Sequence, residues 1–83
     1  MGRTLRSPAY QTLLDELRAA RAAAGLTQQA VADALGYPQS YIAKIEGGER
    51  RVDAVELLAL LSVLNADWKR LLSKVEKVRA SAS

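Results

Sequence analysis

The chain has 83 residues and a mass of 9.0 kDa, with 49% hydrophobic and 25% charged residues, which is typical of one globular domain, so we assign residues 1–83 to a single domain. It contains no Cys and no His, which excludes a disulfide framework, zinc-finger sites and catalysis by Cys or His. The nine acidic residues are scattered, so we expect no metal site, no cofactor and no enzymatic activity.

Twelve Lys and Arg residues give a formal net charge of +3, which favours an anionic partner. No apolar run approaches the roughly 18 residues of a membrane-spanning helix, and residues 1–6 lack the apolar stretch of a signal peptide. We therefore expect a cytoplasmic protein. Residues 1–6, which include Arg3 and Arg6, are interpreted as a flexible basic arm.

Helix is favoured along the whole chain, because Ala and Leu dominate, Phe is absent and no segment alternates with period two. Gly, Pro and capping residues divide the chain into five predicted helices: Pro8 up to Gly25, Thr27 up to Gly36, Pro38 or Gln39 to Glu46, Ala54 to Leu64, and Trp68 to about Arg79. Asp53 followed by Glu56 resembles a capping box. Residues 80–83 are expected to fray.

The second and third predicted helices have the spacing of a helix-turn-helix. Gly36 supplies the positive φ of the turn between them, and the small side chain of Ala32 allows the next helix to cross closely. The two helices share an apolar seam made of Val31, Leu35, Tyr37, Ile42 and Ile45.

The third predicted helix has two unlike faces. Ile42 and Ile45 point to the core, and the opposite face is small and polar, formed by Gln39, Ser40, Ala43, Lys44 and Gly47. Such a face suits a DNA major groove, because amides pair with adenine and Lys reaches guanine or a phosphate. Periodicity alone also allows an ordinary solvated face.

Two stretches, GLTQQAVADALG at residues 25–36 and PQSYIAKIEGGER at residues 38–50, resemble the lambda-repressor-like (Cro/CI, or XRE) DNA-binding family. The resemblance extends from about Leu13 to Leu72. It implies an all-α fold of five helices, with the helix-turn-helix at the second and third. The sequence departs from the family at Pro38, where a Ser or Thr cap is usual; Pro still pre-sets φ for a helix start.

The resemblance also implies roles for individual positions. It places base contacts at Gln39, Ser40 and Lys44, and phosphate contacts at Gln28, Tyr41, Arg50 and Arg51, with Gln28 also bracing Gln39. It implies a buried ion pair between Arg21 and Glu46, two charges that lie on apolar stripes and so require partners. Solvated roles for the two amides and the two loop arginines remain as alternatives, and the N-terminal arm either reaches the duplex or stays idle.

The last two predicted helices carry more apolar surface than a small core requires. The fourth is apolar nearly all round, and the fifth has an apolar stripe. A leftover apolar surface marks an interface, and a twofold homodimer is the simplest solution. We therefore expect a dimer interface formed by Leu64, Trp68, Leu71, Leu72, Val75 and Val78. The alternative is that the fifth helix folds back and completes the monomer.

These features predict a sequence-specific transcription regulator that binds a palindromic operator in double-stranded DNA as a homodimer, without a cofactor. Its size resembles the stand-alone regulators of phages and of restriction–modification or toxin–antitoxin operons. One alternative is an antitoxin-type regulator that also binds a toxin or other partner protein. Another is a helical interaction module that does not bind DNA.

Overall fold

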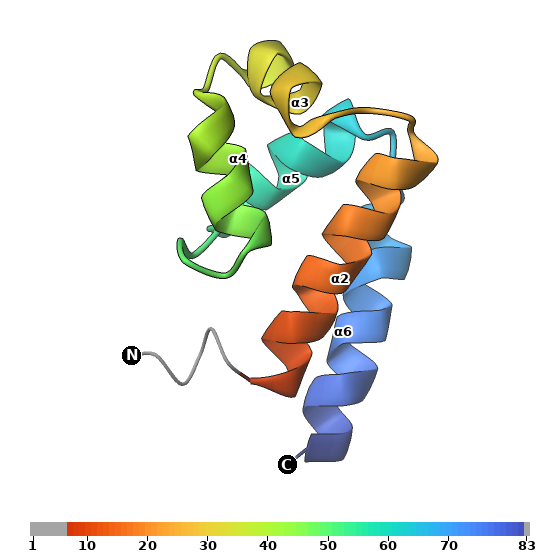
Figure 1. Cartoon of the computed structure of the whole chain (residues 1–83). Coiled ribbons are helices and arrows are strands. Elements are labelled where there is room, and N and C mark those ends of the chain that lie inside the picture. The colour runs from red at the N-terminus through yellow and green to blue at the C-terminus, as the bar shows by residue number, and fades with distance from the viewer. Residues whose placement is uncertain (1–6, 83) are drawn as a thin grey trace.

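The computed structural model describes residues 7–82, which form five α-helices labelled α2 to α6 (Figure 1). Their bounds are Pro8–Ala23 for α2, Gln28–Leu35 for α3, Gln39–Glu46 for α4, Ala54–Val63 for α5 and Trp68–Ala82 for α6. The prediction of an all-α fold with five helices is confirmed. The basic arm, residues 1–6, and Ser83 lie outside the described residues. None of the five helices is long and apolar enough to cross a membrane.

Side chains that cap backbone N–H groups explain where most helices begin. Ser7 and Thr27 each accept a hydrogen bond from the backbone N–H three residues further on. Asp53 and Glu56 form a reciprocal capping box at the start of α5. The Asp67 carboxylate accepts from the first turn of α6 at 3.0 Å.

Backbone conformation explains where the helices end. Gly36 ends α3 in the left-handed region, with φ 75°, and turns the chain into α4. A Cβ at this position would meet no atom within 4 Å, so the requirement for Gly is conformational rather than steric. At the other end of the chain, α6 continues through residues 80–82 rather than fraying after Arg79, because Ala80 and Ser81 contain no helix breaker.

The first and last described helices form the long axis of the molecule. α2 and α6 lie side by side and run in opposite directions, and α3, α4 and α5 gather at one end of this pair (Figure 1). Lys74 Nζ lies 3.3 Å from Glu16 Oε1 across the α2–α6 contact. One core joins all five helices, and its most deeply buried large side chains are Leu14, Val31, Ile42, Ile45 and Leu61.

The packing of α6 places the residues expected at a dimer interface in different environments. Leu64 and Leu71 are only 6% and 5% exposed and belong to the core of this chain. Leu72 and Val75 are partly buried against that core, and Val78 is also partly buried. Trp68 remains exposed at 47%. The fifth predicted helix, α6, therefore folds back on α2, and most of its apolar stripe is buried within the monomer.

Candidate nucleic-acid interface

The helix that follows the Gly36 turn, α4, has one buried and one exposed face. Ile42 and Ile45 are almost fully buried, which fixes the inward face of α4 on the core. Gln39, Ser40 and Lys44, the three residues expected to contact bases, are exposed. The exposed face therefore carries polar hydrogen-bonding groups and no bulky aliphatic side chain, as an approach to base edges requires.

The start of α4 has no side-chain cap, since Pro38 occupies the N-cap position and makes no cap hydrogen bond. The first N–H groups of a helix have no intrahelical acceptor, and they carry a partial positive charge. An anion is a suitable partner for such groups. This departure from the family pattern leaves the start of α4 open to a phosphate.

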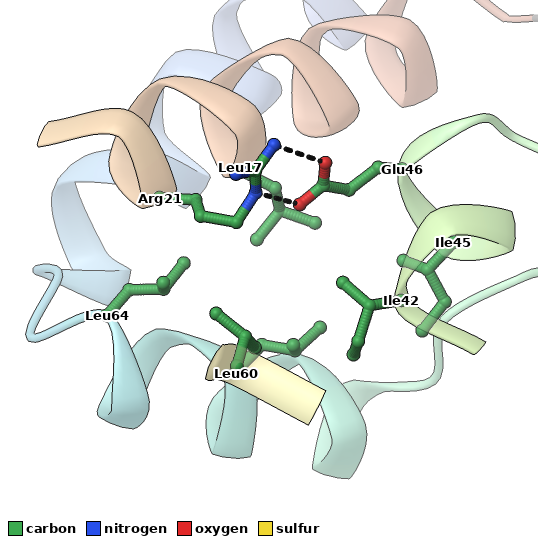
Figure 2. A pocket seen from close by; sticks show the side chains of 8 residues that line it. Leu17, Arg21, Ile42, Ile45, Glu46, Leu60 and Leu64 are labelled. Atoms are coloured by element: carbon green, nitrogen blue, oxygen red, sulfur yellow. Dashed lines mark hydrogen bonds and ion pairs between the residues drawn. The ribbon is translucent and has the colours of Figure 1, made fainter. Parts of the chain in front are cut away.

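Arg21 and Glu46 form a bidentate ion pair between α2 and the end of α4 (Figure 2). Arg21 Nε lies 2.7 Å from Glu46 Oε2, and Arg21 Nη2 lies 3.0 Å from Glu46 Oε1. Arg21 also donates to the Leu26 carbonyl at 3.0 Å. The hydrogen bond with Glu46 raises the pKa of Arg21, against the opposing effect of burial. Glu46 is 7% exposed, so a partner is required here, and the pair satisfies it.

The two glutamines expected to act together are in contact. Gln39 Nε2 donates to Gln28 Oε1 at 2.8 Å, and Gln28 Nε2 donates to Glu46 Oε1 at 3.0 Å. Gln28 is partly buried and Gln39 is exposed. The amide at the start of α4 is therefore connected through Gln28 to the ion pair in the interior.

A small cavity adjoins the ion pair, but it does not form a ligand site. Its volume is about 10 Å³, near the minimum that one water molecule needs. Leucine and isoleucine side chains line most of it, with Arg21 and Glu46 at one side (Figure 2). Within residues 7–82, no group of three or more Asp or Glu side chains could hold a metal ion. The polar surface of α4, where the expected base-contact residues lie exposed, is the candidate functional site.

A second cluster joins α4, the following loop and the start of α5. The Tyr41 hydroxyl donates to Glu56, and Arg50 Nη2 donates to the Tyr41 hydroxyl at 3.2 Å and to Glu56 Oε2 at 2.9 Å. The Arg50 guanidinium also lies over the Tyr41 ring, 4.5 Å from its centroid. Tyr41 in turn contacts Tyr37, with the ring centroids 4.3 Å apart. Two of the expected phosphate-binding residues are therefore held together by one carboxylate.

This cluster changes the acidity of its members. Burial raises the pKa of Tyr41, and the hydrogen bond to Glu56 adds to the increase. The pKa of Glu56 is lowered, chiefly by the hydrogen bond from the Asp53 N–H and then by that from Tyr41. The sequence predicts Glu56 only as a capping residue. The capping box places its carboxylate at the start of α5, where it also reaches Arg50.

The remaining expected contacts are unpaired within the part of the chain that the structure describes. Lys44 and Arg51 are exposed, and neither forms an ion pair with any of residues 7–82. Arg18 is not among the residues predicted from the sequence; it donates to the Glu46 carbonyl and also pairs with Asp15 three residues before it. The spacing of Asp15 and Arg18 is a signal for the local pair, but nothing in the sequence signals the contact with Glu46.

Comparisons with known proteins agree with this arrangement. A family model described as a helix-turn-helix domain matches residues 12–73. A solved structure titled "XRE-family like protein from Pseudomonas syringae pv. tomato str. DC3000" is 44% identical, with a TM-score of 0.82, over 90% of this chain and 92% of that one. The comparison with curated proteins finds no match. The chain therefore belongs to the XRE-like helix-turn-helix family and is a DNA-binding regulator.

Proposed function

We propose that this protein is a cytoplasmic transcription regulator that recognises a specific palindromic operator in double-stranded DNA as a homodimer. α4 enters the major groove, where Gln39, Ser40 and Lys44 contact base edges. The single observation that carries this proposal is the exposed polar face of α4, whose leading amide, Gln39, is held by Gln28 at 2.8 Å. A held amide loses little conformational entropy on binding, whereas an ordinary solvated glutamine is free to rotate.

Phosphate contacts fix the position of α4 on the duplex. The uncapped start of α4 supports one such contact, and the partly buried Gln28 lies beside it. Arg51 supports another, because it is exposed and has no ion-pair partner among residues 7–82. Tyr41 and Arg50 complete the proposed set, with Arg50 leaving Glu56 when it engages a phosphate.

A homodimer follows from the number of base pairs that one helix contacts, which is too small to specify one site in a genome. Two copies related by a twofold axis place their recognition helices in successive major grooves, about 34 Å apart. Large apolar side chains that the monomer leaves exposed support an interface: Val55 at 77%, Leu58 at 49% and Trp68 at 47%. Val55 and Leu58 are three residues apart on α5 and so share one face.

The test is selection of bound sequences from random duplex DNA, followed by affinity measurements over a range of salt concentrations. We expect one enriched site with two inverted halves. If a dimer neutralises about six phosphates, log K falls against log salt with a slope of about −5. Equal affinity for all duplexes, or a shallow slope, would contradict the proposal.

A further inference from the structure

A continuous line of hydrogen bonds connects the buried ion pair to the exposed start of α4. Arg21 holds both oxygens of Glu46, at 2.7 and 3.0 Å. Glu46 Oε1 accepts from Gln28 Nε2 at 3.0 Å, and Gln28 Oε1 accepts from Gln39 Nε2 at 2.8 Å. A buried charged pair thus reaches an exposed amide through a single intermediate side chain.

The chemistry of these groups determines which side chain donates and which accepts in each hydrogen bond. A carboxylate offers only acceptors, so Gln28 must turn its amide nitrogen toward Glu46. Gln28 then accepts with its amide oxygen, so Gln39 must donate from its amide nitrogen. Of its two N–H donors, Gln39 uses one on Gln28. It keeps one N–H donor and its carbonyl acceptor for another partner.

We propose that Glu46, held by Arg21, is a positioning residue for base recognition, because its carboxylate sets the direction of both amides and leaves Gln39 with the donor and acceptor that match adenine. This inference rests on the proposed function. Adenine presents an acceptor, N7, beside a donor, the N6 amino group, whereas guanine presents two acceptors, N7 and O6. An amide with one free donor and one free acceptor matches the adenine pattern and leaves one guanine acceptor without a donor. A purely structural ion pair would have no effect on which base is preferred.

The experiment first identifies the base position whose preference disappears in Gln39→Ala, by selection from random duplexes. Dissociation constants are then measured for adenine and for guanine at that position. In Glu46→Gln the new amide can turn either its oxygen or its nitrogen toward Gln28, so both glutamines can reverse. We expect the adenine preference, about 5- to 150-fold in the wild type, to fall to about twofold or less.

Arg21→Lys is the matched control, because it keeps the positive charge and the Glu46 carboxylate while removing the bidentate geometry. It lowers thermal stability but keeps the adenine preference. Gln28→Ala is the second test, because it cuts the line while leaving the ion pair intact. It folds like the wild type and loses the preference as Glu46→Gln does, so the inference remains testable even where Glu46→Gln fails to fold. Circular dichroism at the assay temperature verifies the fold of each variant.

Several results would overturn the inference. One is a Gln39-dependent position that prefers a base other than adenine. Another is an adenine preference that is unchanged in Gln28→Ala or in folded Glu46→Gln. A third is an equal loss of the adenine preference in Arg21→Lys, because that loss would follow the decrease in stability rather than the direction of the amides. In each of these cases sequence-specific binding itself still stands. A wild type that selects no sequence at all would overturn both the inference and the proposed function.

Discussion

Arg50 Nη2 lies 2.9 Å from Glu56 Oε2, so an arginine suited to a DNA phosphate is paired with a carboxylate of its own chain. The pair is partly exposed, with 45% of the Arg50 side chain accessible to solvent, and surface pairs of this kind contribute little to stability. A phosphate can therefore compete for Arg50 at a small cost. We therefore expect Glu56 to compete with DNA phosphates for Arg50 and to lower the general affinity for nucleic acid.

Replacing Glu56 with Gln releases Arg50 and removes one negative charge near the proposed interface. We expect tighter binding to all duplexes, with the salt slope steeper by about one unit for each protomer that gains a phosphate contact. Titration of a fluorescent duplex at several salt concentrations measures both effects. Glu49→Gln is the matched control, because Glu49 is an exposed acid in the same loop and forms no ion pair with residues 7–82. An equal gain in both variants would show that net charge alone is responsible.

The lowered pKa of Glu56 predicts a pH-dependent contribution to stability. A carboxyl whose pKa is depressed in the folded state stabilises the fold above its unfolded pKa, about 4.3, and this contribution is lost as pH falls through the depressed value. Glutamine keeps the acceptor of the capping box but not the charge, so the free energy of unfolding of the wild type should exceed that of Glu56→Gln by roughly 0.3–1 kcal/mol at neutral pH. The difference should vanish in strong acid. Urea unfolding of the two proteins from about pH 7 to pH 2 measures it. A difference in stability that is the same at about pH 7 and pH 2 would contradict the lowered pKa of Glu56.

Base and phosphate contacts are separable by mutation. Gln39→Ala should cost roughly 1–3 kcal/mol on the preferred site and relax one base position, because a bidentate base contact is lost. Arg51→Ala should weaken binding to all sequences about equally and make the salt slope shallower. Both side chains are exposed, so neither change should alter stability much. An unchanged selection profile in Gln39→Ala would show that α4 does not contact the bases.

The Arg21–Glu46 pair is also expected to stabilise the fold. Arg21→Ala leaves Glu46 as a buried carboxylate without its counter-ion and should cost about 3 kcal/mol or more. That loss corresponds to a decrease in Tm of more than about 10 °C for a domain of this size. The double change Arg21→Met with Glu46→Leu should recover part of it, since no charge is then left unpaired. An Arg21→Ala protein that melts with the wild type would refute the structural role.

A charge on the exposed face of α5 tests the homodimer. Leu58→Glu should give a monomer that keeps its helix content and loses orders of magnitude in operator affinity, because the new carboxylate would be desolvated beside its symmetry mate. Ser73→Glu on α6 is the control, since Ser73 is exposed and lies away from the apolar stripe of that helix. Analytical ultracentrifugation at micromolar protein gives the assembly state. A wild type that is monomeric both free and on DNA would contradict the twofold arrangement.

Local signals predict most of this fold. Ser7, Thr27 and Asp53 mark helix starts because a cap satisfies N–H groups within three residues. Gly36 marks the turn because its φ of 75° is costly for other residues. These interactions span a few positions, so a single sequence is enough to identify them. The polar face of α4 follows equally from helical periodicity.

Contacts between distant positions could not be predicted in the same way. Arg18 reaches the carbonyl of Glu46 across 28 positions, and the Tyr41 hydroxyl reaches Glu56 across 15, so both depend on how the helices pack. The apolar stripe on α6 indicates that this face of the helix must be buried. Because the hydrophobic effect is non-directional, the stripe alone does not indicate whether it packs on α2 or on a second copy of the chain. The structure places α2 there.

The pairing of α2 with α6 joins the first described helix to the last one. During synthesis α2 emerges before its partners, and the part of its apolar surface that packs on α6 has no cover until Trp68–Ala82 has been made. The helices that carry most of the proposed DNA contacts, α3 and α4, are made in between. A nascent chain that has reached the end of α5 therefore holds every proposed DNA contact but leaves part of α2 uncovered, and the fifteen residues of α6 close that surface.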